Sequence, residues 1–389
     1  MNITYEKYIQ SLPSLIKPSL CSNSLFQLLY KNTINAQNQW LDDNFTQNQI
    51  IYTKQPTFTS IPNYHYIDQE IRTLIESSRC FEKKYELHIH HRIYNVFLSY
   101  PSKNIHNKSK IDDFFDDCIM KIYIWLYISH YYSRHNCSES MNINIYFSSH
   151  KKLMDSGVVL DSLHVNSAFT TSCKQHTQLC LYRYEEWFKV FIHETFHNIG
   201  YDFSDANDTY LNHFMKQLFQ IHSNNDLRIY ETYCELWAEI LNCFFLSFFQ
   251  CETINQCKKM FHNALKNQIK FSVLQTIKIL KHNHTNYNDF TNNSSKHVKF
   301  QEKTYVFSYY ILKMILLFYC GDFEKWCIRH NTNIFQFHNN KQNFILFGKL
   351  VQEKYKDEKL LNYIQKIQRH VQNYSLPREL AVTMRMTVE

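Results

Sequence analysis

The sequence predicts an α+β protein, in which a small sheet is followed by two long helices and a mostly helical C-terminal lobe. Three segments have the residue pattern of strands, at 84–100, 141–148 and 177–183. Two longer segments, 182–201 and 227–250, have the length and apolar content of helices. The 389 residues can bury a sizeable core, and the low number of glycines and prolines, 4 and 6, leaves little flexible linker.

The N-terminal region, residues 1–79, is predicted to contain short helices and irregular connections. Pro56 and Pro62 mark one such connection. No residue of this region is expected to carry chemistry.

The central domain is predicted over residues 80–255. A strand at 84–100 opens it, a helix over 111–132 follows, and a second strand is expected at 141–148. One face of the first strand would hold its apolar residues, Leu87, Ile89, Ile93 and Phe97.

The C-terminal lobe, residues 256–389, is predicted to be mostly helical. A helix is expected over 257–279, and the polar stretch 282–299 suits a loop. The densest apolar segment, 304–319, is expected to pack in a core, and it also carries the tyrosines Tyr305, Tyr309 and Tyr310.

A histidine-rich stretch in the first strand offers two interpretations. His88, His90 and His91 could form a metal cluster, or they could lie along the solvent face of a strand. No acid or cysteine nearby completes a metal site, so the solvent-facing interpretation is favoured.

The segment 182–201 contains the pattern HExxH, from His193 to His197. At about 3.6 residues per turn, His193 and His197 lie on one face of a helix and can reach the same metal ion. Glu194 lies beside them and can act as a base. The alternative is an ordinary core helix with surface histidines, but a buried glutamate without a partner is costly. We therefore expect a zinc site here.

Three acids stand four residues apart in the segment 227–250: Glu231, Glu235 and Glu239. They fall on one stripe of a helix whose other residues are largely apolar. Such acids either contact a metal or a histidine, or form a solvated edge of an amphipathic helix. Metal or histidine contact is the favoured prediction.

Together, the two segments resemble the gluzincin clan of HExxH zinc metallopeptidases, since Glu235 follows His197 by 38 residues. The resemblance implies a zincin-like catalytic domain in which Glu235 is the third zinc ligand. It also implies that Glu239 accepts a hydrogen bond from a zinc histidine, with Glu231 as alternative ligand or supporting acid. The block 165–202 is also similar to uncharacterised HExxH proteins of giant DNA viruses.

A further likeness lies upstream of the zinc helix, at Asn166, Ala168 and Phe169. Several gluzincin families have a similar stretch on the edge strand that pairs with an extended substrate. The resemblance therefore implies substrate binding by these residues, and an ordinary loop and strand is the alternative.

The metzincin pattern is a second zinc option, because Gly200 completes an HxxG match. The third metzincin ligand would fall at Phe203, which cannot bind a metal. Asp202 and Asp205 are out of register, and Met384 and Met386 are weak indications of a Met-turn. The gluzincin interpretation is preferred.

The expected activity is hydrolysis of a peptide bond in a protein or peptide substrate, with Zn²⁺ as cofactor. Glu194 would move the proton from water to the leaving amine, and Tyr309 or Tyr310 would stabilise the oxyanion. A rival hypothesis is a zinc-containing structural or interaction protein of a virus particle. Glu194 argues against it, since a purely structural site needs no base.

Charge and composition argue against several other classes of protein. The net charge of +7 is scattered along the chain, so nucleic-acid binding is not indicated. No segment resembles a secretion signal or a membrane span, which predicts a soluble, intracellular protein of the host cytoplasm or the virion. The 12 cysteines contain no CxxC pair and are predicted to be reduced. The sequence leaves the oligomeric state open.

Overall fold

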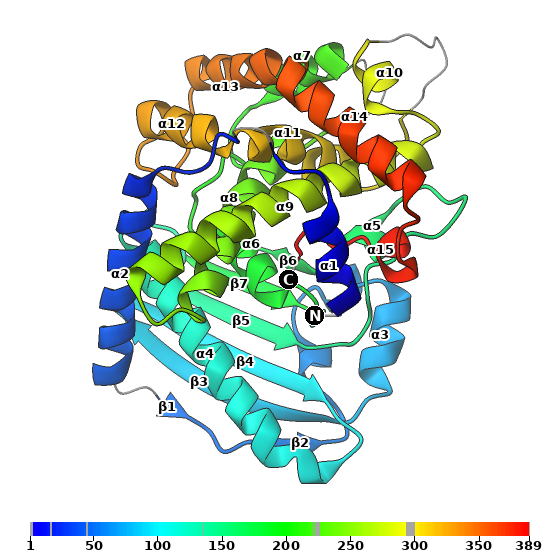
Figure 1. Ribbon diagram of the computed structural model, residues 1–389. Coiled ribbons are helices and arrows are strands. Elements are labelled where there is room, and N and C mark those ends of the chain that lie inside the picture. Colours follow the sequence, from blue (N-terminus) through cyan, green and yellow to red (C-terminus); the bar gives the residue numbers. More distant parts are fainter. Residues whose placement is uncertain are drawn as a thin grey trace. The chain divides into compact units, whose positions relative to one another are not determined.

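The computed structural model describes residues 3–15, 18–43, 46–134, 136–219, 221, 226–292 and 300–388. This part of the chain contains a small mixed sheet and a helical C-terminal part, which confirms the α+β class (Figure 1). Two compact units are present. Unit 1 comprises Met1–Phe26, Lys152–Val165 and Phe203–Glu389, and unit 2 comprises Gln27–Lys151 and Asn166–Asp202. Neither unit is one continuous stretch, whereas the sequence predicts three consecutive regions.

Unit 2 holds the sheet and the helices that pack on it. Its helices are most of α2 (Asn23–Asp42), η1 (Thr57–Ser60), η2 (Tyr64–Tyr66), α3 (Gln69–Glu76), η3 (Ile105–Asn107), α4 (Lys108–His130) and α6 (Trp187–Asn198). Its strands are β1 (Thr46–Gln47), β2 (Ile51–Thr53), β3 (Cys80–Ile89), β4 (Arg92–Pro101), β5 (Ser140–Tyr146), β6 (Ala168–Thr170) and β7 (His176–Leu181).

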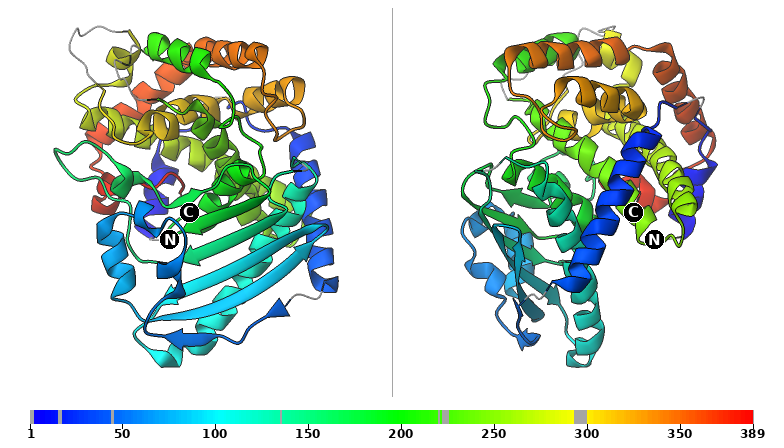
Figure 2. Two further views of the ribbon diagram at one scale, coloured as in Figure 1. Left: turned by 180° about the vertical axis from the view of Figure 1, so that it is seen from behind. Right: turned by 90° about the vertical axis from the view of Figure 1, so that its left-hand side faces the viewer.

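The strands form one mixed sheet, in the order β1-β3-β4-β5-β7-β6, with β2 also paired to β3 (Figure 2). Neighbours β4, β5 and β7 are parallel, and β3 is antiparallel to β4. The short strand β6 lies at the edge and is antiparallel to β7, with Ala168 opposite Leu181. The strands predicted at 141–148 and 177–183 are thus present as β5 and β7.

The strand predicted over 84–100 is instead a hairpin. His90 and His91 form a two-residue turn, with Ile89 paired to Arg92 and His90 at φ 54°. The turn shifts the alternation, so Leu87 is buried while Ile93 is 40% exposed. The prediction was wrong at this point because Leu87, Ile89, Ile93 and Phe97 keep an even spacing across the turn, which has no glycine or asparagine to mark it.

Helices α4 and α6 cover the same face of the sheet. Helix α4 packs against β3 and β4, α6 packs against β6 and β7, and the two helices touch each other (Figure 1). A buried hydrogen bond joins them, in which Trp125 Nε1 donates to Thr195 Oγ1 at 2.6 Å. The Trp125 ring also stacks on Phe196, with centroids 6.0 Å apart. These contacts pack α6 against α4 and the sheet.

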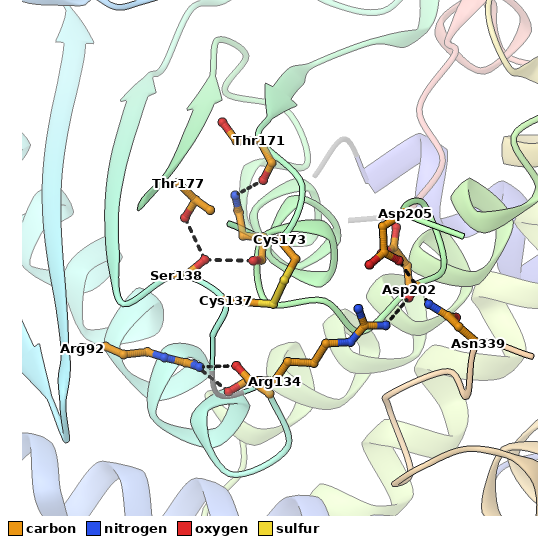
Figure 3. The surroundings of a disulfide bond; sticks show 12 residues. Arg92, Arg134, Cys137, Ser138, Thr171, Cys173, Thr177, Asp202, Asp205 and Asn339 are labelled. Atoms are coloured by element: carbon orange, nitrogen blue, oxygen red, sulfur yellow. Dashed lines mark hydrogen bonds between the residues drawn. A yellow bond between two sulfur atoms is a disulfide. The ribbon is translucent and has the colours of Figure 1, made fainter. Parts of the chain in front are cut away.

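The prediction of reduced cysteines is wrong for one pair, because Cys137 and Cys173 form a disulfide (Figure 3). Their Cα atoms are 4.8 Å apart, although 36 residues separate them in sequence. The other ten cysteines are unbridged and nearly all buried, as expected of core thiols. No spacing motif marks the bridged pair, so the sequence alone does not identify it.

Unit 1 is helical. It contains α1 (Ile3–Ser11), α5 (Ser162–Val165), α7 (Thr209–Phe219), α8 (Ile229–Phe248), α9 (Ile254–His282), α10 (Tyr287–Asn292), the π-helix η4 (Phe307–Leu312), α11 (Lys313–Phe318), α12 (Cys320–His330), α13 (Lys341–Lys354), α14 (Glu358–Asn373) and α15 (Arg378–Val382). Helices α8, α9, η4 and α11 pack on one another at its centre. Among the described residues, no helix combines the length and the apolar character needed to cross a membrane.

Candidate metal centre

Helix α6, which carries the HExxH pattern, has a well-defined end. Gly200 is in the left-handed region, at φ 74°, and its N–H donates to the His197 carbonyl. The N–H of Tyr201 donates to the Phe196 carbonyl at 2.9 Å, which completes a Schellman motif. A Cβ at position 200 would lie 2.9 Å from Arg134 Cδ and from Cys137 Sγ, so both conformation and space require glycine here.

The two histidines of the pattern face each other, as the helical period predicts. His193 and His197 are both buried, and their Nε2 atoms are 3.3 Å apart. Two ligands about 2.0–2.1 Å from a tetrahedral zinc ion are themselves roughly 3.3 Å apart. The observed separation therefore fits a pair of zinc ligands.

Asp202 determines which nitrogen of His197 is available. Its Oδ2 lies 2.6 Å from His197 Nδ1, and both groups are buried. A carboxylate at this distance favours a proton on Nδ1, which places the lone pair of the ring on Nε2, the atom that would bind a metal ion. The sequence places Asp202 near the site but only as an out-of-register metzincin ligand. The structure shows it supporting His197, the role predicted for Glu239.

Glu194 is buried on the same helix and lies near strand β7. Burial raises the pKa of the Cys180 thiol to about 12, and the negative charge of Glu194 adds to that increase. Glu194 of the HExxH pattern is thus a buried carboxylate beside the sheet.

The three acids of α8 are all buried, so the alternative of a solvated acidic edge is excluded. Unit 1 holds the start of this helix in place through η4. Ser308 Oγ donates to the Leu227 carbonyl at 2.6 Å, and Thr232 Oγ1 donates to the Ser308 carbonyl at 3.0 Å.

The donor set of His193, His197 and Glu231 could hold a metal ion. All three residues are buried, and together they offer two imidazole nitrogens and one carboxylate oxygen, a common set for zinc. Glu235, the ligand expected from the sequence, belongs to no such group in the described part of the chain. Glu231, the alternative ligand, is one helical turn earlier.

Glu239 forms a buried ion pair with Lys313 of α11, and the two side chains are 0% and 1% exposed. Its carboxylate therefore neutralises a buried cation within unit 1. This partner was not apparent from the sequence, because Lys313 interrupts an apolar segment 74 residues away.

We expect Glu239→Ala to destabilise the protein by about 3–5 kcal/mol, because it leaves the buried Lys313 ammonium without a counter-ion. The double variant Glu239→Leu/Lys313→Met should recover most of this loss. Urea unfolding of both variants measures the effect. Unchanged stability of Glu239→Ala, together with an approximately tenfold loss of zinc affinity, would instead support the sequence prediction that Glu239 accepts a hydrogen bond from a zinc histidine.

The two tyrosines proposed as oxyanion donors differ in their surroundings. Tyr310 is buried in a cluster with Leu160 and Met384, and its hydroxyl donates to the Met384 carbonyl at 2.5 Å. Tyr309 is only partly buried at the edge of that cluster. Nearby, the Arg228 guanidinium lies 4.4 Å from the ring centroid of Tyr305. Tyr309 is therefore the better candidate of the two.

The residues predicted to bind substrate lie at the sheet edge. Ala168 and Phe169 belong to β6, whose side chains are partly buried. Asn166 precedes the strand, and its carbonyl accepts a hydrogen bond from Arg183 Nε at 2.9 Å. Strand β6 is at the sheet edge, and substrate binding by these residues stays a prediction.

The metzincin alternative gains no support from the environment of Phe203. This side chain is fully buried in unit 1, with its ring centroid 4.4 Å from that of Phe337. Asp205 Oδ1 accepts a hydrogen bond from Asn339 at 3.1 Å (Figure 3).

The histidines of the β3–β4 hairpin are exposed, in agreement with the solvent-facing interpretation. His88 Nε2 lies 2.9 Å from Glu86 Oε1, and His90 stacks on His130 with centroids 4.2 Å apart. In the described residues, none of these histidines belongs to a group that could hold a metal ion.

Comparison of the chain with family models, with curated proteins and with solved structures found no match in any of the three.

Proposed function

We propose that this chain is a zinc metallopeptidase of the gluzincin type that hydrolyses peptide bonds in a protein or peptide. One observation carries the proposal: the Nε2 atoms of His193 and His197 are buried 3.3 Å apart, with Asp202 holding the Nδ1 of His197. Without a cation or a shared proton, two imidazole lone pairs facing each other at this distance would repel.

The proposed ligands are His193, His197 and Glu231. With Glu231 as the third ligand, Glu235 is the acid four residues later, which supports a zinc histidine in the gluzincin pattern. Zinc, when bound, supplies a Lewis acid that stabilises developing negative charge and makes water a nucleophile at neutral pH. Glu194 accepts a proton from the attacking water and passes it to the nitrogen of the leaving amine.

Two further roles follow from the arrangement of the chain. The backbone of edge strand β6, with Ala168 and Phe169, is the proposed source of donors and acceptors for an extended peptide. The Tyr309 hydroxyl is the proposed donor to the oxyanion that forms on the carbonyl oxygen. The zincin-like fold proposed for the catalytic part is consistent with a mixed sheet carrying an antiparallel edge strand beside the HExxH helix.

The proposal is tested by metal analysis of the purified chain together with a peptide-library cleavage assay. We expect about one zinc ion per chain, and cleavage that stops on chelation and returns when zinc is added back. Zinc at full occupancy without cleavage of any library peptide would favour the alternative of a zinc-containing structural or interaction protein. Absence of bound zinc would refute both.

A further inference from the structure

The end of helix α6 is capped by the loop that precedes β5. The last carbonyl groups of a helix have no partner within the helix. Here Ser138 Oγ donates to the Asn198 carbonyl at 2.9 Å, and the Arg134 N–H donates to the Ile199 carbonyl at 3.3 Å. This loop therefore fixes the helix one residue beyond His197.

The Cys137–Cys173 disulfide joins that loop to the connection between β6 and β7 (Figure 3). The same connection touches the end of α6, since Asn198 Nδ2 donates to the Thr171 carbonyl at 2.8 Å. The Cys137 sulfur itself lies against Gly200, where no Cβ would fit. One covalent bond thus ties together two loops that both hold the end of the HExxH helix.

The loop that caps α6 also contacts Asp202, the residue that orients His197. Arg134 Nη2 lies 3.5 Å from the Asp202 carbonyl oxygen. Arg134 is held in turn by Arg92, whose Nη2 donates to the Arg134 carbonyl at 2.8 Å (Figure 3). This loop therefore contacts the residue whose carboxylate meets His197.

We propose that the Cys137–Cys173 disulfide is a redox-dependent clamp that positions His197 and Asp202, so that its reduction weakens zinc binding. The clamp rests on the proposed function, because it regulates the same zinc site. No ligand is removed on reduction; the support of one ligand becomes looser.

Thiol–disulfide exchange with a dithiol such as dithiothreitol accounts for the change. Cys137 is fully buried and Cys173 is partly exposed, so the attacking thiolate reaches Cys173 Sγ. The Cys137–Cys173 bond breaks as a mixed disulfide forms, and Cys137 leaves as a thiolate and takes up a proton. The second thiol of the reductant then releases Cys173, and the reductant becomes a cyclic disulfide. Two electrons pass to the protein.

The size of the effect follows from what outer partners contribute to metal sites. Loss of a group that orients a metal-binding histidine typically costs about 10- to 100-fold in metal affinity. Reduction loosens such a group without deleting it, so we expect about a tenfold increase in the zinc Kd.

The test uses the full chain and the double variant Cys137→Ser/Cys173→Ser, which avoids a metal-binding reductant in the assay. Cys251→Ser is the matched control, since Cys251 is an unbridged and partly exposed cysteine of unit 1. Zinc Kd is measured by competition with a chromophoric chelator. An approximately tenfold increase in the double variant, with none in Cys251→Ser, supports the clamp. Equal values in all three proteins, or absence of the disulfide by peptide mapping of oxidised protein, overturn it.

Amide hydrogen exchange at residues 199–202 gives a readout that does not need zinc. Exchange there should become faster on reduction of the wild-type chain, and unchanged exchange would contradict the clamp. If the wild type binds no zinc, the proposed function fails, while exchange still decides whether the clamp exists. If the double variant does not fold, Ser138→Ala replaces it: the disulfide is kept, the bond to Asn198 is lost, and an unchanged zinc Kd would count against the clamp.

Discussion

His193→Ala and His197→Ala are each expected to lower zinc affinity more than about a hundredfold, because each removes one of two imidazoles that meet at 3.3 Å. Loss of a group that only orients a ligand already lowers metal affinity by roughly 10- to 100-fold. Loss of the ligand itself should lower the affinity by more than that. Zinc content after dialysis, followed by competition titration, measures the change. Far-ultraviolet circular dichroism confirms that the variants remain folded.

The same titration identifies the carboxylate ligand. Glu231→Ala should lower zinc affinity nearly as much as the histidine variants do. Glu235→Ala should lower it about tenfold, as expected for a supporting acid. The two residues are buried on the same helix and differ by one turn, so they are matched controls for each other. The reverse order would identify Glu235 as the third ligand. Full zinc content in both histidine variants would contradict the proposed zinc site.

Glu194→Gln is expected to keep zinc bound and the fold intact while reducing kcat by about 10²- to 10⁴-fold. Glutamine has nearly the shape of glutamate but cannot accept the proton of the attacking water. Because Glu194 is buried beside β7, bulk water cannot easily replace it as a base. Steady-state cleavage of a peptide selected from the library measures the effect, with zinc content determined on the same sample.

Asp202→Asn serves as a comparison for this variant, since it alters a group that supports a ligand and leaves the base in place. Asp202→Asn should lower zinc affinity. Excess zinc should restore much of the activity that this variant loses. Glu194→Gln should gain nothing from added zinc. Normal turnover in Glu194→Gln would mean that another group is the base.

The part of the site that local periodicity determines could be predicted from the sequence. His193 and His197 are one turn apart, so a helix brings them together whatever surrounds it. The same regularity could not choose among the acids of α8, because Glu231, Glu235 and Glu239 share one face. The choice depends on tertiary partners such as Lys313, whose position the sequence does not give.

Features that arise where the chain reverses direction were harder to predict. The apolar residues before and after the turn at His90 and His91 keep an even spacing, so the sequence does not distinguish a hairpin from one long strand. Asp202 meets His197 only because Gly200 ends the helix and turns the chain back. Cys137 and Cys173 are brought together by neighbouring ends of parallel strands, which no local pattern records.

The discontinuous units have a consequence for dissecting the protein. A fragment of residues 80–255, the catalytic domain expected from the sequence, would contain α8 without α9, η4 and α11, the helices that bury it. The apolar surface of α8 would then be exposed, and such a fragment should aggregate. Each unit also closes only after distant segments have been synthesised, which slows folding relative to a chain with local contacts. Functional dissection of this protein therefore calls for point substitutions within the intact 389-residue chain.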